Sequence, residues 1–416
     1  MVQLIVTFIA FVTLLAAPQP YKRSSVVKAY RTCMKDKNFK QARQVLDDAM
    51  RDYPETAAQD AQLYKYKADA LVELIAAENR KIYLKSNPDT VAYFNYIYDL
   101  YVTGLACDSV EQSDIHAKTA EGKKADAKLR SGVGQTLLPY RKNLVGAGKF
   151  HYRKKNYANA FKFLDMYAQT KTADVFLDSK GNTLVTDSAD LQEVSVLAAL
   201  SAYGSDNYRG VMEYLPESLT DTAIADKLLE VGSKSAAELG DTTEMIRLLE
   251  DGFFAYPTSE YFLMTLTKYY NDHGEYEKAL EKAMRMTQLY PQTRDYWFML
   301  GKEQMLLGKY PDALASFEEC VQLMADDAES WAAIGNIRLR GAHEAYAQFN
   351  VPLSDPTYNR KKAAITERYK QACAAFEKAA KFAENNPDLW LTGLRETYFK
   401  LNRGKDLRAL EKYSKQ

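Results

Sequence analysis

The side chains that could do chemistry are few and scattered along this chain. Its four histidines have neither mutual proximity nor the spacing of metal ligands; they are His116, His151, His273 and His343. A structural role near helix ends is expected for His151 and His273. No HExxH or GxSxG motif and no known cysteine–histidine pattern is present. The sequence therefore predicts no catalytic residue, no metal site and no cofactor, and we expect that the protein is not an enzyme.

Three glycine-containing stretches could suggest phosphate or dinucleotide binding. Gly308 precedes Lys309, but no strand comes before this pair and no Ser or Thr follows the lysine. VGAGKF, which contains Gly148, lacks the first glycine of a phosphate loop, and SGVGQTLL follows a polar stretch instead of a strand. These glycines are better explained as close-contact or turn residues between helices.

The four cysteines have spacings that match no zinc ligand set; they are Cys33, Cys107, Cys320 and Cys373. All but Cys107 fall on apolar stripes of expected helices. We therefore expect buried free thiols, although an exported protein could also form disulfides.

The composition is that of an ordinary soluble protein with balanced charge. Lys+Arg and Asp+Glu each number 55 in 416 residues, so no basic excess favours nucleic acid. The chain also has 30 tyrosines, which either take part in helix packing throughout or in part line a binding surface.

The amino end carries an uncharged apolar run, VQLIVTFIAFVTLLAA, at residues 2–17. It is shorter than the roughly 20 residues of a spanning helix, and we expect 1–20 to be an export signal, with a periplasmic location. The alternative is an uncleaved membrane anchor, because no basic residue precedes the run and Lys22 and Arg23 follow it.

A repeat with a period of 34 residues organises the carboxyl half. At this offset several residues coincide with one of the same type: Trp297 with Trp331, Gly274 with Gly308, Ala279 with Ala313, and Pro257 with Pro291. Gly301 and Ala313 are expected where two antiparallel helices cross closely. Gly308 should end the first helix, and Pro311 should lie in the first turn of the second.

These residues resemble the tetratricopeptide repeat, whose signature is W-x2-L-G-x2-Y, then A-x3-F, then P. The resemblance implies an all-α fold, a right-handed α-solenoid of helical hairpins. The whole chain also resembles large exported tetratricopeptide proteins of Bacteroidota of unknown function, on three stretches: LPYRKNLVGAGKFHYRKKNY, AQFNVPLSDPTY and LWLTGLRETYFKLN. That resemblance implies an envelope protein and no particular activity.

Four regions are expected along the chain. After residues 1–20 come diverged helical repeats over 21–135, ending in a polar loop at 108–135, and then middle repeats over 136–225. The regular array covers 226–416 and ends in capping helices and a solvated EKYSKQ tail. Trp331 lies 41 residues before Ala372, whereas Trp297 lies 16 before Ala313. This insertion predicts a lengthened hairpin over 331–384, about 12 residues longer in each helix, with a new helix capped by Asp355.

The first helix of each repeat should line the inner, concave wall. This geometry nominates Asp295 and eight partner-binding candidates: Tyr261, Met264, Lys268, Asn271, Phe298, Lys302, Met305 and Asn336. The alternative is that these residues pack against the next repeat or face water. The Lys/Asn/Arg set of the carboxylate-clamp subclass is not reproduced.

Two hypotheses follow for function. In the first, the protein is a scaffold that holds a peptide segment or a partner protein in this groove at the cell envelope. In the second, it is an assembly or regulatory subunit that docks through the lengthened hairpin at 341–370. A membrane would be contacted only through an uncleaved amino-terminal segment, and the oligomeric state stays open.

Overall fold

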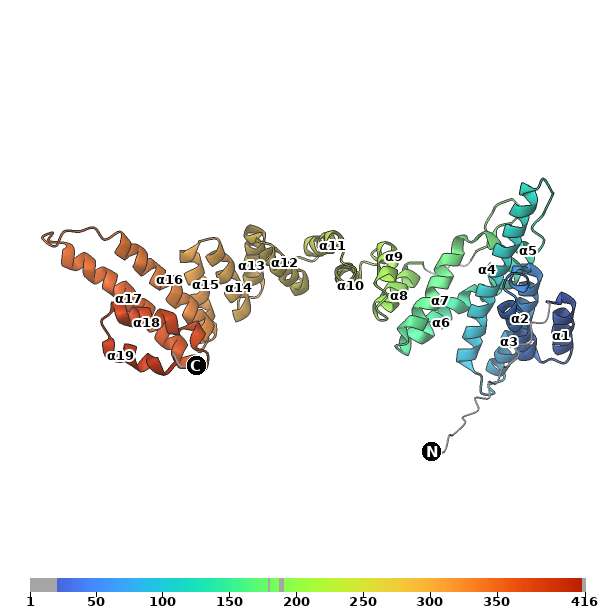
Figure 1. Ribbon diagram of the computed structural model, residues 1–416, viewed down its shortest axis with the longest axis horizontal. Coiled ribbons are helices and arrows are strands. Elements are labelled where there is room, and N and C mark those ends of the chain that lie inside the picture. The colour runs from blue at the N-terminus through green and yellow to red at the C-terminus, as the bar shows by residue number, and fades with distance from the viewer. Residues whose placement is uncertain (1–20, 179, 187–190, 414–416) are drawn as a thin grey trace, which may run out of the picture. The chain divides into compact units, whose positions relative to one another are not determined.

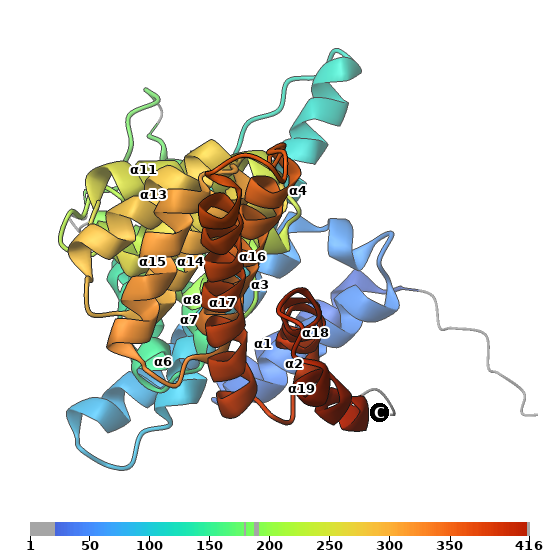
Figure 2. The same cartoon turned by 90° about the vertical axis from the view of Figure 1, so that its left-hand side faces the viewer.

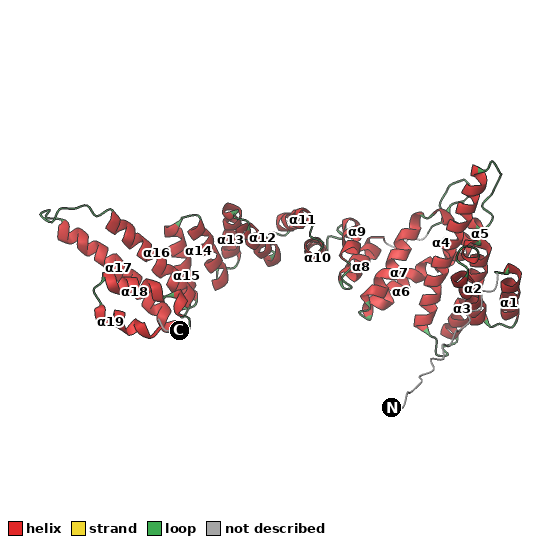
Figure 3. Ribbon diagram, in the orientation of Figure 1, coloured by secondary structure: helices red, strands yellow, loops and turns green. Residues whose placement is uncertain are grey.

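The structure is a computed structural model that describes residues 21–178, 180–186 and 191–413. Figure 3 shows helices joined by loops over this part of the chain, with no strand. One isolated antiparallel bridge pairs Leu177 with Thr183. The predicted all-α architecture of tetratricopeptide-like hairpins is therefore confirmed. The predicted signal or anchor, residues 1–20, lies outside the described residues.

The chain divides into two units after Val231, and each is described by itself. Unit 1 contains nine α-helices among its described residues: α1 (Arg23–Lys35), α2 (Phe39–Asp52), α3 (Ala61–Tyr83), α4 (Thr90–Ala120), α5 (Arg130–Leu137), α6 (Arg141–Arg153), α7 (Tyr157–Gln169), α8 (Leu191–Tyr203) and α9 (Tyr208–Ser218). Short 3-10 turns lie at Ala57–Gln59, Leu138–Tyr140, Thr170–Thr172 and Asp174–Phe176. Helix α10 (Ala225–Glu238) contains the boundary.

Helix α4 continues through a segment that was predicted to be loop. The polar loop expected at 108–135 is shorter than predicted, because α4 runs to Ala120 and α5 begins at Arg130. Two acidic side chains of this stretch of α4, Asp108 and Glu111, have partners in the following segment, although the stretch lacks an apolar period. The carboxylate of Glu111 is buried and accepts hydrogen bonds from the backbone N–H groups of Leu129 and Arg130, and Arg130 pairs with Asp108 at 2.6 Å.

Unit 2 is a series of hairpins in which each helix packs against the next (Figure 1). Its helices are α11 (Thr242–Ala255), α12 (Glu260–Asp272), α13 (Tyr276–Leu289), α14 (Arg294–Leu306), α15 (Tyr310–Leu323), α16 (Ala328–Ala347), α17 (Tyr358–Phe382), α18 (Leu391–Lys400) and α19 (Gly404–Ala409), with 3-10 turns at Pro387–Leu389 and Leu410–Tyr413. No helix in the described ranges has the length and apolar character needed to cross a bilayer.

The 34-residue register reproduces the same local contacts in successive hairpins. The indole N–H of Trp297 donates to the carbonyl of Pro291 at 2.8 Å, and that of Trp331 donates to Ala325 at 2.9 Å, each six residues back. At the crossing of α14 and α15, a Cβ on Gly301 would lie 2.9 Å from the ring of Phe317. The small-residue seam predicted from the sequence is thus present.

The turn between α14 and α15 also has the predicted geometry. Gly308 has φ +70°, the left-handed conformation that glycine adopts without steric cost. Pro311 lies in the first turn of α15, where its missing N–H loses no hydrogen bond. The glycine–lysine pair is therefore a hairpin corner.

The lengthened hairpin is formed by α16 and α17, which lie side by side in Figure 2. They have 20 and 25 residues, against 13 and 14 in α14 and α15, so the extension is unequal and smaller than predicted. The remaining inserted residues form the connection at 348–357. Helix α17 begins at Tyr358 after Thr357, and Asp355 instead caps the preceding turn by accepting from the Thr357 N–H.

The carboxyl-terminal helices close unit 2 around one tryptophan. Trp390 is buried, and Tyr413 meets its ring edge-on with centroids 5.0 Å apart. The Tyr413 hydroxyl donates to Glu384 at 2.7 Å. The tail expected to be solvated is therefore anchored as far as Tyr413.

Candidate functional site

A pocket of about 580 Å³ lies between α12 and α14, the first helices of two successive hairpins. Five of the eight predicted partner-binding residues line it: Met264, Lys268, Asn271, Phe298 and Lys302. Asp295 also lines it, together with residues that were not predicted: Thr265, Thr267, Met299 and Glu303. Spacings of three and four residues place each helix's members on one face.

Equivalent positions of the two repeats meet in this pocket. Met264 and Phe298 are 34 residues apart and supply its apolar wall. Lys268 and Lys302 are likewise one repeat apart, and both are exposed. The pocket therefore combines an apolar wall with mobile cations at its edge.

Three predicted residues are not part of this pocket. Tyr261 packs against α10, where its hydroxyl lies 3.0 Å from the Ser233 hydroxyl and the Lys234 amine lies 4.9 Å from its ring centroid. Met305 is partly buried against the core around Phe317. Asn336 is exposed on α16. These contacts agree with the alternative that some first-helix residues only pack or face water.

Glu303 is the residue of this site that the sequence reasoning missed. Its side chain is only 1% exposed, and neither carboxylate oxygen has a hydrogen-bond partner among the described residues. Burial raises the pKa of Glu303 to about 7, although the positive charge of Lys302 opposes this shift. The sequence did contain a signal for it. In the 34-residue register Glu303 is equivalent to Tyr269 and Ile337, so a carboxylate replaces the aromatic and aliphatic residues of the neighbouring repeats.

A partly buried ion pair lies behind one wall of the pocket. The Arg294 guanidinium lies 4.3 Å from the ring centroid of Phe298 and is hydrogen-bonded to Asp327, the N-cap of α16. Burial opposes ionisation of Asp327, but hydrogen bonds from Arg294 and Ser330 outweigh it and lower its pKa. The pair thereby links the pocket wall to the start of the next hairpin.

A second, smaller cavity of about 370 Å³ lies in the lengthened hairpin. Four aromatic residues and two lysines are among its lining residues: Tyr346, Phe349, Tyr358, Tyr369, Lys362 and Lys400. The Tyr369 hydroxyl is buried and has no hydrogen-bond partner in the described part of the chain. Of the lining residues, Tyr346 is 58% exposed, and Leu353, in the connection between α16 and α17, is 81% exposed.

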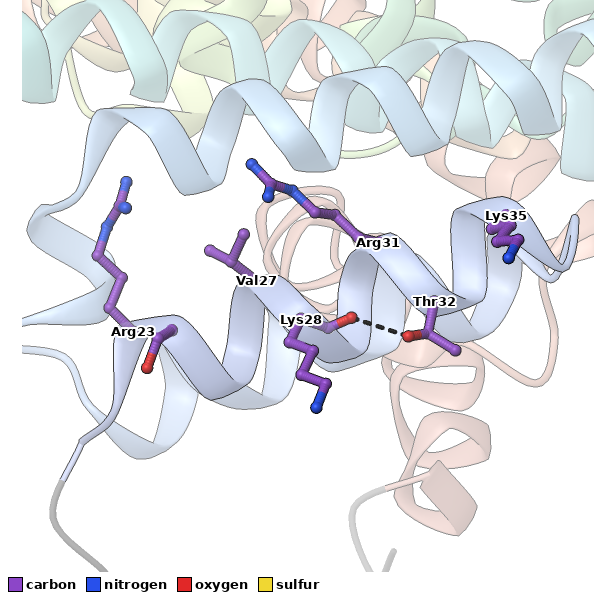
Figure 4. Close-up of a pocket in the computed structure, with 7 residues that line it drawn as sticks. Arg23, Val27, Lys28, Arg31, Thr32 and Lys35 are labelled. Atoms are coloured by element: carbon purple, nitrogen blue, oxygen red, sulfur yellow. Dashed lines mark hydrogen bonds between the residues drawn. The ribbon is translucent and has the colours of Figure 1, made fainter.

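Another concavity, of about 800 Å³, borders α1 alone and is not a cleft between elements. Figure 4 shows its basic side chains, Arg23, Lys28, Arg31 and Lys35, along that single helix, with the Thr32 hydroxyl donating to the Lys28 carbonyl. Arg23 pairs with Asp60. A charged face on one terminal helix provides no enclosed site.

The histidines and cysteines form no reactive group in the described ranges, where no cluster could hold a metal ion. The four thiols are free, and burial raises the pKa of Cys107 to about 12 and that of Cys320 to about 11. Cys33, expected to be buried, is only half-buried. His151, expected to be partly exposed, is buried against Phe163, and this burial lowers its pKa.

No family model and no curated protein matches the chain. Solved tetratricopeptide repeat structures are similar to it. The C-terminal part of one from Cytophaga hutchinsonii is 14% identical over 64% of this chain and 92% of that one, with a TM-score of 0.41. One from Parabacteroides merdae is 12% identical over 62% and 99%, with a TM-score of 0.33.

A structure titled MamA AMB-1 is also similar, with 18% identity over 46% of this chain and 92% of that one and a TM-score of 0.33. All three TM-scores lie below 0.5, so these similarities assign neither a fold nor a role to this chain. The repeat in this chain is established by its own geometry, above all by the equivalent contacts of Trp297 and Trp331.

Proposed function

We propose that this protein is a non-enzymatic scaffold that binds an extended segment of a partner protein in the pocket between α12 and α14. The observation that carries the proposal is the gathering of Met264, Lys268, Asn271, Phe298 and Lys302 around one pocket. Methionine and phenylalanine suit adaptable apolar contact, while lysine and asparagine suit the polar groups of a peptide backbone.

The repeat geometry favours an extended occupant. Met264 and Phe298, and likewise Lys268 and Lys302, are equivalent residues on neighbouring hairpins. An extended peptide also presents similar backbone groups at regular intervals, so successive parts of one peptide can bind the equivalent residues of both hairpins.

Site-specific crosslinking in the native host tests the proposal. A photo-reactive amino acid would replace Lys302 in one strain and Lys309, an exposed lysine at the hairpin corner, in the control strain. We expect position 302 to capture a defined segment of a partner protein and position 309 to capture none. Equal capture at both positions, or none at 302, would contradict a groove-bound partner.

Substitution then measures the contribution of the groove. Phe298→Ala combined with Lys302→Glu should weaken binding of the captured partner about tenfold or more. The matched control combines Phe254→Ala with Lys309→Glu, which changes one highly exposed phenylalanine and one exposed lysine away from the pocket. This control should bind as the unmodified protein does.

The proposed location is the cell envelope, with export directed by residues 1–20. The support is the apolar run at 2–17. Cell fractionation combined with amino-terminal sequencing of the mature protein tests this location, since a signal is removed and an anchor is retained. A cytoplasmic protein that retains Met1 would contradict export.

The lengthened hairpin supports a second candidate function, docking of an assembly partner. The supporting observations are the exposure of Tyr346, which lines the aromatic cavity, and of Leu353 in the connection between α16 and α17. Leu353→Asp and Tyr346→Ala should then abolish partner capture, and the Phe298 and Lys302 substitutions should leave it unchanged. The opposite pattern identifies the groove as the binding surface.

A further inference from the structure

The pocket between α12 and α14 contains a buried carboxylate that the fold leaves unpaired. Glu303 is almost completely inaccessible, and neither of its oxygens accepts a hydrogen bond from any described residue. Buried polar groups in proteins nearly always have partners, because losing hydration without a replacement costs free energy. Such a carboxylate in a cavity wall calls for an explanation.

The repeat itself does not require a carboxylate at this position. The equivalent residues one repeat away are Tyr269 and Ile337, and Ile337 is buried in the core. A neighbouring hydroxyl is also already used, since Thr267 donates to the Leu263 carbonyl at 2.7 Å. The feature is therefore specific to this pocket.

The surroundings of Glu303 define the chemistry of an occupant. Met264, Phe298 and Met299 make the pocket wall apolar, whereas its other charged residues, Lys268, Asp295 and Lys302, are exposed. The carboxylate of Glu303 is already shielded from water, so an occupant of the pocket is what could supply its missing partner. A purely apolar group would leave the carboxylate without any partner, and an anion would be repelled by it.

We propose that this pocket binds a long basic side chain of the partner, with its alkyl stem against Met264, Phe298 and Met299 and its cationic end paired with Glu303. The inference rests on the proposed function, because it names the side chain that a bound segment presents to this site. Arginine and lysine both have an apolar stem and a terminal cation, which the wall and the carboxylate complement. Glu303 then acts as the specificity-determining residue of the groove.

Small-molecule probes test the inference on the full chain without knowledge of the partner. The probes are n-butylguanidinium, which is cationic, and n-butylurea, a neutral molecule of the same shape. Binding is followed through the ¹³C-methyl resonances of Met264 and Met299, assigned by single Met→Leu variants. We expect the cation to bind about tenfold more tightly than the urea. Equal affinity for the two probes would overturn the proposal without any use of a Glu303 variant.

Two isosteric variants test which carboxylate causes the preference for the cationic probe. Glu303→Gln should abolish the preference for the cation, whereas Asp295→Asn, which neutralises the exposed carboxylate of the same pocket, should preserve it. A preference that survives Glu303→Gln, or is lost in Asp295→Asn, would place the cation at the pocket edge and overturn the inference.

The outcome is distinguishable from failure of the proposed function. Crosslinking at position 302 reports whether a partner occupies the groove, whatever the sequence of that partner. If position 302 captures a partner while the probes bind equally, the scaffold function stands and the basic-side-chain inference fails. If the probes discriminate and position 302 captures nothing, the pocket chemistry is supported and the scaffold function fails.

Discussion

The ring of Phe376 lies directly over Gly335, so a Cβ on Gly335 would come within 2.8 Å of ring carbons. This contact between α16 and α17 is the counterpart of the contact between Gly301 and Phe317 one repeat earlier. The second helix therefore returns to the repeat register after the insertion. Gly393 on α18 approaches the same ring even more closely.

Gly335→Ala should destabilise unit 2 by about 1–3 kcal/mol, because the added methyl group requires Phe376 to move in a packed core. Gly341→Ala in the same helix is the matched control, since the added Cβ would lie 3.8 Å from its nearest neighbour, a side-chain nitrogen of Arg368. It should be neutral or stabilise by about 0.5–1 kcal/mol. Urea unfolding followed by tryptophan fluorescence reports on this unit, which contains Trp297, Trp331 and Trp390. Equal effects of both substitutions would contradict the packing described here.

The buried carboxylate of Glu303 predicts an unusual dependence of stability on pH. Its pKa is raised from about 4.5 to about 7, so the native state binds more protons than the unfolded state between these values. The free energy of unfolding should therefore fall as the pH rises from 4.5 to 7. The wild type should lose about 1–3 kcal/mol over this range from this residue alone.

Glu303→Gln should remove this component, so that the variant gains stability relative to wild type as the pH is raised. Urea unfolding at pH 5 and pH 8 measures the difference. Asp295→Asn, an exposed carboxylate of α14, is the control and should show no such gain. An identical pH dependence in wild type and Glu303→Gln would show that Glu303 is not the titrating group.

The ion pair between Arg294 and Asp327 predicts the opposite pH behaviour. Asp327→Asn retains a side chain able to cap α16 but removes the buried charge that pairs with the partly buried Arg294 guanidinium, so it should cost about 1–3 kcal/mol at pH 7. The pKa of Asp327 is lowered, so its contribution is present above the unfolded value and is lost as the pH falls through the folded value. The difference between variant and wild type should thus shrink in acid. Asp326→Asn, at the adjacent exposed position, controls for a general charge effect.

Thiol labelling distinguishes Cys33 from the other cysteines. Cys33 is half-buried, whereas Cys107, Cys320 and Cys373 are buried, and burial raises the pKa of each of these three. Iodoacetamide at pH 8 should therefore modify Cys33 first in the native protein and the other three only after unfolding. Mass spectrometry of tryptic peptides measures the order. Early labelling of Cys107 would contradict its buried position.

Much of unit 2 was predictable because its sequence follows the repeat rules in order. Gly301, Gly308 and Pro311 lie where the repeat requires a small residue, a left-handed turn and a helix start, and the late position of Ala372 correctly indicated an insertion. The length of α4 was not predictable from apolar periodicity, because Glu111 satisfies backbone groups of a distant segment. Contacts of this kind become visible only when the tertiary structure is known.

The candidate site was predictable in part for the same reason. Helical spacing identified Met264, Lys268 and Lys302 as members of one face, and the structure places them around one pocket. The same spacing could not show that Tyr261 packs against α10, since this depends on the angle of the preceding hairpin. Glu303 was missed because a carboxylate among many helical carboxylates looks exposed until its burial is known.

The connection between α16 and α17 joins two helices that already meet in register at Phe376. The packing of the two helices therefore depends on contacts outside residues 348–357. The chain in this connection is mostly exposed. Such a site tolerates new chain ends or a foreign domain. A fluorescent reporter inserted between Asn350 and Ser354 should leave the hairpin array of unit 2 intact and report on binding near this connection.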